Sequence, residues 1–232
     1  MPGALLDRWN GDPILIAFLV ALAALHLWHV PERRGAAALG WAVAAFAFLS
    51  PLCALSVSLF SARVGQHMIL VLVAAPLIGG ALPPPSGRHG AIWPSVIAFS
   101  AALWLWHMPV PYDATFRSVP LYWAMHVSLF GSAIWLWRQL LGHRPDAAFA
   151  SLAGGTVASV LMGLLGAVIA LSGHPLYLWH VSLTEVWGLS PLADQQLGGI
   201  LMWVPGCLFF LWAAMRSLAL LWTTLEQPVR AR

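Results

Sequence analysis

The chain has 232 residues, of which 60% are hydrophobic and only 8% are charged. Soluble domains carry roughly 25% charged residues, so this composition excludes an ordinary soluble protein and indicates an integral membrane protein. The net charge of +3 comes from arginines spread singly or in pairs along loops, which indicates membrane topology rather than a nucleic-acid-binding surface. No polar stretch is long enough for a separate soluble domain, so we expect a single membrane domain over residues 1–232.

Apolar segments of membrane-spanning length recur along the chain. A spanning helix needs about 20 mostly apolar residues. The segments that qualify are approximately 13–30, 36–59, 64–82, 91–107, 121–141, 148–171 and 198–225. We therefore predict an all-α membrane protein, a bundle of seven transmembrane helices. Glycines in the sixth segment predict a small-residue face for close helix packing.

The arginines predict the orientation of this bundle. With the N-terminus outside, the inner loops and the tail contain Arg33, Arg34, Arg88, Arg138, Arg144, Arg230 and Arg232. The outer segments then contain Arg8, Arg63 and Arg117. Cytoplasmic loops carry the excess of basic residues, so we predict the N-terminus outside and the C-terminus in the cytoplasm. The first span lacks the flanks of a signal peptide, so we expect it to be retained.

Three histidines, each beside a methionine, fall in the outer third of the predicted bundle. They are His67-Met68, His107-Met108 and Met125-His126. Hydrocarbon disfavours ionisable side chains, so those within spans usually face the bundle interior. Imidazole and thioether form a ligand set suited to copper, and methionine sulfur favours Cu(I). Neighbouring residues on a helix point about 100° apart, so we expect the histidines to be the ligands, joined by one or two methionines.

Other candidates lie near this layer. His174 belongs to the outer loop that follows the sixth span, and Met202 lies at a similar depth in the seventh. Asp194 either caps the last helix or accepts the second ring N–H of a ligand histidine, and Gln195 beside it is a candidate for the same supporting role. Cys53 is a buried small side chain or a transient copper ligand.

Several motifs resemble those of the CtaG family of cytochrome c oxidase assembly factors. They are Gln66-His67-Met68, Trp106-His107-Met108-Pro109, His126, and the stretch from Gly188-Leu189-Ser190-Pro191 through Asp194-Gln195-Gln196 to Met202-Trp203-Val204-Pro205. The resemblance implies a protein of the bacterial inner membrane that helps to mature haem–copper oxidases by supplying copper. It implies oxidase subunits and periplasmic copper chaperones as partners, beside the lipid bilayer. Members often carry histidines where this chain has Arg63 and Tyr122.

Other interpretations stay open at this stage. The three histidines could instead be neutral side chains that hydrogen-bond between helices. A haem-binding electron-transfer protein needs facing histidine pairs on two helices, and a copper transporter needs ligands at several depths. His26 and His29, near the inner end of the first span, are interface side chains or a second metal or haem site. No motif of hydrolytic or redox catalysis occurs, so we expect no enzyme.

Overall fold

In the computed structural model, helices account for almost all of the described chain. The structure describes residues 2–84, 92–142 and 147–230, without the side chains of Pro2 and of residues 224–230. The long helices are α1 Pro13–His29, α2 Arg34–Leu49, α6 Ile92–His107, α8 Val119–Leu141, α9 Ala148–Leu171 and α10 Pro191–Arg230. Shorter ones are α3 Pro51–Ser58, α4 Phe60–Met68, the π-helical η3 Ile69–Ala74, α5 Ala75–Ala81 and α7 Pro109–Ala114. Single turns are η1 Pro2–Ala4, η2 Pro31–Arg33, η5 Leu178–His180 and η6 Glu185–Trp187. The prediction of an all-α protein is confirmed for the described residues.

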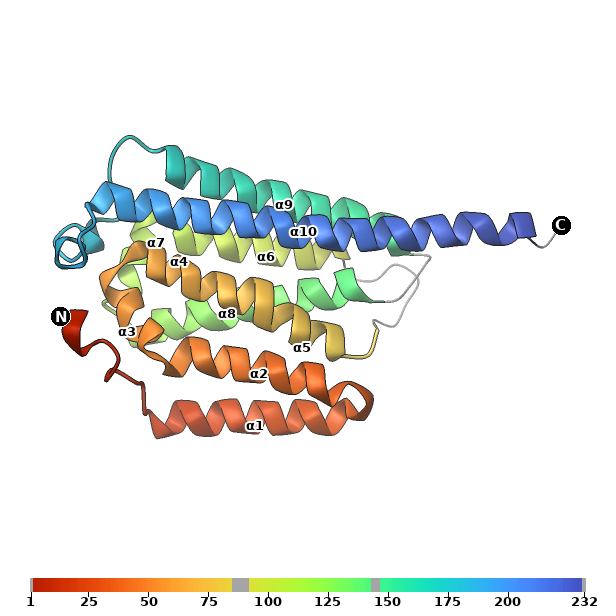
Figure 1. Ribbon diagram of the computed structural model, residues 1–232, viewed down its shortest axis with the longest axis horizontal. Helices are drawn as coiled ribbons and strands as arrows, with labels where there is room; N and C mark the ends of the chain where they lie inside the picture. Colours follow the sequence, from red (N-terminus) through yellow and green to blue (C-terminus); the bar gives the residue numbers. More distant parts are fainter. Residues whose placement is uncertain (1, 85–91, 143–146, 231–232) are drawn as a thin grey trace.

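The long helices lie side by side along one axis. α10 packs against α9 and α4, α8 packs against α5 and α6, and α1 lies on α2 at one side of the bundle (Figure 1). The N-terminus lies at one end of the bundle, and the C-terminal part of α10 projects beyond the opposite end (Figure 1).

The helices are apolar enough for a membrane protein. Within the residues that the structure describes, four helices are long and apolar enough to cross a membrane: Phe60–Ala81, Val119–Leu141, Ala148–Leu171 and Pro191–Thr223. The bent pair Pro13–His29 and Pro31–Leu49 would make a fifth span, and Ile92–His107 is a shorter apolar helix. Within the described chain, helix is present in each of the seven predicted ranges. Length and composition therefore show a helical membrane protein with several spans.

Two helices begin earlier than the sequence predicts. α10 begins at Pro191 rather than near 198, and α4 begins at Phe60 rather than near 64. Arg63, which we assigned to an outer segment, therefore lies inside α4, where its side chain is only 1% exposed. The placement of Arg63 in a segment between helices was wrong because the acceptor that starts α4 comes from another helix, as described below. The side chains of Arg88, Arg144, Arg230 and Arg232, and residue 91 at the start of the fourth predicted span, lie outside the described residues.

Glycines bring α9 and α10 into backbone contact. A Cβ atom at Gly166 would lie 2.9 Å from the carbonyl oxygen of Gly199, and one at Gly199 would lie 2.5 Å from the backbone nitrogen of Ala170. No side chain fits in this space, so the predicted small-residue face of the sixth segment is confirmed at Gly166. This close contact fixes α10 on the bundle and so places its first turn beside α4.

Candidate metal centre

The structure brings His67, His107 and His126 together from three helices. His67 lies on α4, His107 ends α6 and His126 lies on α8. The ring centre of His67 is 5.5 Å from that of His107 and 5.3 Å from that of His126. All three residues are buried. We call these three residues the histidine cluster.

Hydrogen bonds fix the tautomers of two of these histidines. The Nδ1 atoms of His107 and His126 lie 2.7 and 3.0 Å from the carbonyl oxygens of Leu103 and Tyr122. A carbonyl only accepts, so both Nδ1 atoms carry the proton and both Nε2 atoms carry a lone pair. These Nε2 atoms are buried and have no hydrogen-bond partner, and neither ring nitrogen of His67 has one. Unpaired buried polar atoms are rare in folded proteins and call for an explanation such as an ion.

The cluster does not form a closed coordination shell. In the part of the chain that the structure describes, no group of three or more His, Cys, Asp or Glu side chains has an arrangement that could hold a metal ion. The candidate methionines differ in position: Met68, Met125 and Met202 are buried, whereas Met108 is 49% exposed. The buried methionines are therefore the better candidates to complete a set of ligands, and Met108 is the weakest.

Arg63 and Tyr122 lie one helical turn from the cluster, each four residues before one of its histidines. The Arg63 guanidinium donates to Thr115 Oγ1 at 2.8 Å, and its central carbon lies 4.0 Å from the ring centre of Phe116. The ring centre of Tyr122 is 4.3 Å from that of His126. A buried cation and a phenol thus occupy the positions where the resemblance implies further histidines.

Cys53 lies close to the histidine cluster, in contact with Tyr122. Its sulfur is 3.8 Å from the hydroxyl of Tyr122, and its thiol is free. Cys53 is part of α3, the helix that leads into α4. The contact places a soft sulfur near the cluster, behind the Tyr122 ring.

Aromatic side chains cover the cluster towards the loop end of the bundle. Tyr177 donates its hydroxyl proton to the carbonyl oxygen of His107 at 2.7 Å, and its ring stacks on Phe60 with centres 4.0 Å apart. His180 Nε2 lies 2.8 Å from the Tyr112 hydroxyl. Burial raises the pKa of Tyr177 and lowers that of His180 to about 4, so both side chains stay neutral. Neutral aromatic side chains therefore pack between the histidine cluster and the loop before α10, and the Arg63 guanidinium packs against two of the neighbouring rings.

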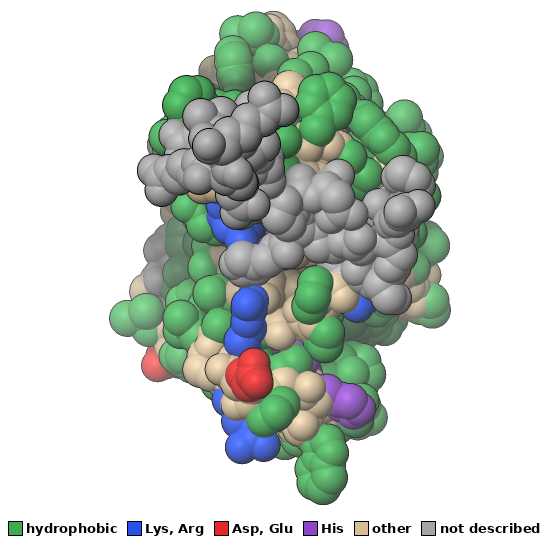
Figure 2. Space-filling model, turned by 90° about the vertical axis from the view of Figure 1, so that its right-hand side faces the viewer, with side chains coloured by type: hydrophobic (Ala, Val, Ile, Leu, Met, Phe, Trp, Pro, Cys, Tyr) green, Lys and Arg blue, Asp and Glu red, His purple; other side chains and the backbone are tan. Residues whose placement is uncertain are grey.

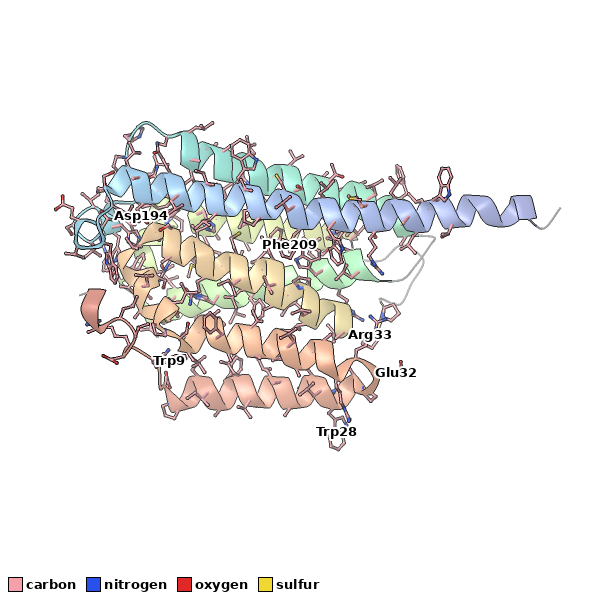
Figure 3. All side chains as sticks on the ribbon, viewed as in Figure 1. Trp9, Trp28, Glu32, Arg33, Asp194 and Phe209 are labelled. Atoms are coloured by element: carbon pink, nitrogen blue, oxygen red, sulfur yellow. The ribbon has the colours of Figure 1, made fainter. Side chains whose placement is uncertain are left out.

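Asp194 does not cap its own helix. α10 begins at Pro191, and Ser190 Oγ accepts the N–H of Ala193 at 3.2 Å as its cap. The Asp194 carboxylate instead accepts the backbone N–H groups of Phe60 and Ser61, at 2.7 and 3.1 Å, together with the Ser61 hydroxyl. These are the first residues of α4, so Asp194 caps the helix that carries His67 (its place at the loop end is labelled in Figure 3). The prediction of Asp194 as a cap of the last helix was wrong, because that helix begins at Pro191, three residues before Asp194.

Gln195 and His174 hold the outer loop. Gln195 Oε1 accepts the N–H of Leu176 at 2.6 Å, and its Nε2 donates to the carbonyl oxygens of Ile169 and His174 at 3.2 and 3.3 Å. His174 is exposed on this loop. The structure thus assigns both residues a structural contact and places neither in the histidine cluster.

His26 and His29 do not form a second pair. His26 is buried, and its Nδ1 accepts the indole N–H of Trp41 at 3.0 Å. His29 is exposed, and its Nδ1 donates to the carbonyl oxygen of Leu25 at 2.8 Å. The two side chains have different partners.

Sequence reasoning missed the roles of Tyr112, Tyr177 and His180 and the burial of Arg63. An arginine within four residues of a span histidine was a usable signal for Arg63. The aromatic layer had no such signal, because it joins α4, α7 and the loop before α10, which are far apart in the sequence.

Together, the apolar helices and the buried polar cluster define a multi-pass helical membrane protein with a candidate ligand site inside its bundle. Residues 89–224, more than half of the chain, match the model of the family described as cytochrome c oxidase caa3 assembly factor, Caa3_CtaG. The chain therefore belongs to this family, as its motifs predicted. The match includes His107, His126 and the region around Asp194, and it begins after His67.

Neither the comparison with curated proteins nor the comparison with solved structures gives a match.

Proposed function

We propose that this protein carries a copper ion at the histidine cluster and passes it to cytochrome c oxidase during assembly of that enzyme. The observation that carries the proposal is the pair of buried Nε2 lone pairs, on His107 and His126, beside the unpartnered ring of His67. A buried polar atom without a partner costs about 1–3 kcal/mol. Coordination of a metal ion would offset this cost, and neutral imidazole with methionine sulfur suits copper.

The membership of the family supplies the recipient, because its members are described as oxidase assembly factors. In this proposal the chain has seven spans in a bacterial inner membrane, with the N-terminus outside. The cluster then lies near the periplasmic face, where copper chaperones deliver the ion. A donor within the bilayer passes Cu(I) to a membrane-embedded oxidase subunit by ligand exchange, without release of the ion to water.

Metal analysis of the membrane-extracted protein tests the proposal. We expect copper in the wild-type protein and a large loss in each of the variants His67→Ala, His107→Ala and His126→Ala, because each removes one ligand of a small set. His29→Ala is the matched control, since His29 is exposed and hydrogen-bonds within its own helix. Copper retained in all three cluster variants would contradict the proposal.

Two further measurements separate the alternatives. A Soret band in the visible spectrum of the purified protein would indicate haem rather than copper. Copper accumulation in proteoliposomes would indicate transport across the membrane. We expect neither result.

A further inference from the structure

An apolar groove opens on the side of the bundle, at the end opposite Asp194. Its volume is about 520 Å³, within the range of about 300–1,000 Å³ that is usual for ligand pockets. Arg33 and Phe209 both line it, the first at the end of the bundle and the second nearer its middle (Figure 3). Its apolar walls include Ala36, Leu72, Val73, Leu77, Leu208 and Trp212. We call it the α5–α10 groove. The exposed side chains of Leu208 and Trp212 leave it open to the side, where the lipid lies.

Two arginines at this end of the bundle are held in place by backbone carbonyl groups. The bonds run from Arg33 Nη1 to the Gly80 oxygen at 2.7 Å and from Arg138 Nε to the Pro83 oxygen at 3.0 Å. Arg33 and Gly80 both line the groove itself. A carbonyl accepts a hydrogen bond without neutralising the positive charge. Among the side chains that the structure describes, Arg33 therefore gives the end of the groove a positive charge, and basic side chains are visible across this end of the molecule (Figure 2).

A second hollow adjoins the groove at Arg33. It has a volume of about 370 Å³, and its walls include His29, Glu32, Arg33 and Pro83. Among the side chains that the structure describes, Glu32 is the one carboxylate in either wall. Arg33 thus stands between an apolar groove and a polar hollow.

We propose that the α5–α10 groove binds an anionic phospholipid. One acyl chain lies along the apolar walls, the phosphate sits on the guanidinium of Arg33, and the rest of the head group occupies the polar hollow. The combination of shapes and charges selects this occupant. A purely apolar ligand would give the Arg33 guanidinium no anion to bind, and a free phosphate would leave the groove unfilled.

Guanidinium groups bind phosphate through paired N–H donors, and basic pockets between membrane helices recognise anionic head groups. The site is at one end of the bundle, where the head groups of a bilayer lie. This inference is independent of copper, since the groove and the histidine cluster share no residue.

Native mass spectrometry of the full-length protein tests the proposal. The protein is extracted in detergent and mixed with equal amounts of phosphatidylglycerol and phosphatidylcholine. We expect phosphatidylglycerol to be retained preferentially. Arg33→Gln should lower this preference about fivefold, the factor that corresponds to about 1 kcal/mol for one arginine near an anionic surface. Arg8→Gln is the matched control, because Arg8 is an exposed arginine outside the groove.

A second pair of variants tests the acyl-chain part of the site without removing a charge. Ala36→Trp fills the groove from α2 and should lower the number of bound phosphatidylglycerol molecules. Ala38→Trp should not, because Ala38 is equally exposed on the same helix but does not line the groove.

Four outcomes would overturn the proposal. Equal retention of both lipids would remove the role of Arg33. Displacement of phosphatidylglycerol by millimolar glycerol 3-phosphate would show a free-phosphate site. An unchanged lipid count in Ala36→Trp would show that the lipid lies outside the groove. A protein dimer that forms only when phosphatidylglycerol is absent would show that a second copy covers the groove.

Discussion

The carboxylate of Asp194 accepts the backbone N–H of Phe60 at 2.7 Å, across 134 positions of the sequence. This bond and the one from Ser61 satisfy two of the free N–H groups at the start of α4, where the preceding residue Leu59 offers no side-chain acceptor. A negative charge at this position also interacts favourably with the helix dipole. Because His67 follows on the same short helix, Asp194 positions His67 along the bundle axis without touching its ring.

Asp194→Ala should therefore destabilise the protein strongly. The substitution leaves two buried N–H groups without partners, at about 1–3 kcal/mol each. Asp12→Ala is the control, because Asp12 caps α1 in an exposed position, where loss of a cap costs about 1 kcal/mol. Thermal unfolding in detergent compares the two variants. If Asp194→Ala costs no more than Asp12→Ala, the buried cap is not important for stability.

The milder variant Asp194→Asn keeps an oxygen acceptor but loses the charge. We expect it to fold and to hold less copper than the wild-type protein, because the start of α4 and therefore His67 shift. Copper content equal to wild type in a folded Asp194→Asn protein would show that the cap does not control the cluster.

The proposed orientation is tested by reporter fusions. A reporter fused after Arg232 should be active only in the cytoplasm, and one inserted near Glu185 only outside, because basic residues favour the cytoplasmic side. The correction of Arg63 leaves Arg8 and Arg117 as the basic residues of the predicted outer segments. The reverse pattern of activities would place the histidine cluster near the cytoplasm and remove the argument for periplasmic copper delivery.

The sequence could predict that the three histidines lie close together, because helix periodicity and the predicted topology determine how deep each residue lies in the bundle. His67, His107 and His126 lie at comparable distances from predicted span ends, and helices of one bundle bring such positions together. The same reasoning correctly predicted helix in each of the apolar ranges, within the described residues, since about 20 apolar residues must satisfy their backbone within a membrane.

The contacts that hold the histidine cluster in place could not be predicted in this way. The cap of α4 by Asp194 and the contact between Cys53 and Tyr122 join residues far apart in the sequence. Local patterns carry no information on such pairs. For the same reason the start of α4 was placed too late and Arg63 was placed in a segment between helices, although it lies within α4 and its guanidinium is buried against Phe116.

Stability should fall in mild acid because of His180. Its Nδ1 lies 3.1 Å from the carbonyl oxygen of Ser58 and must donate, so its Nε2 accepts the Tyr112 hydroxyl. Burial, partly opposed by the Ser58 bond, lowers the pKa of His180 from 6.5 to about 4. The unfolded chain takes up a proton below about pH 6.5 while the folded protein does not, so unfolding becomes easier as pH falls from 6.5 towards 4.

The expected loss is about 3 kcal/mol by pH 4. Unfolding temperatures measured across this range should fall less steeply in His180→Gln, which cannot take up a proton. Parallel curves for the two proteins would show that another group dominates the acid response.

Arg63 should weaken the binding of cations at the histidine cluster and should discriminate by charge. It lies one turn before His67, and its charge acts on all three histidines. At an effective dielectric constant of about 20, a unit charge about 8 Å away would repel a monovalent ion by about 2 kcal/mol and a divalent one by about twice as much. Arg63→Gln should therefore raise the affinity for Cu(I) roughly thirtyfold and that for Cu(II) by a larger factor.

Arg63→Lys keeps the charge and should keep the wild-type ratio of the two affinities. Competition titrations with a Cu(I) chelator and a Cu(II) chelator, on folded protein of each variant, give both constants. An unchanged ratio in Arg63→Gln would show that the guanidinium acts only through its contacts with Thr115 and Phe116. The expected change would support a preference of the proposed site for the monovalent ion, the form that methionine sulfur also prefers.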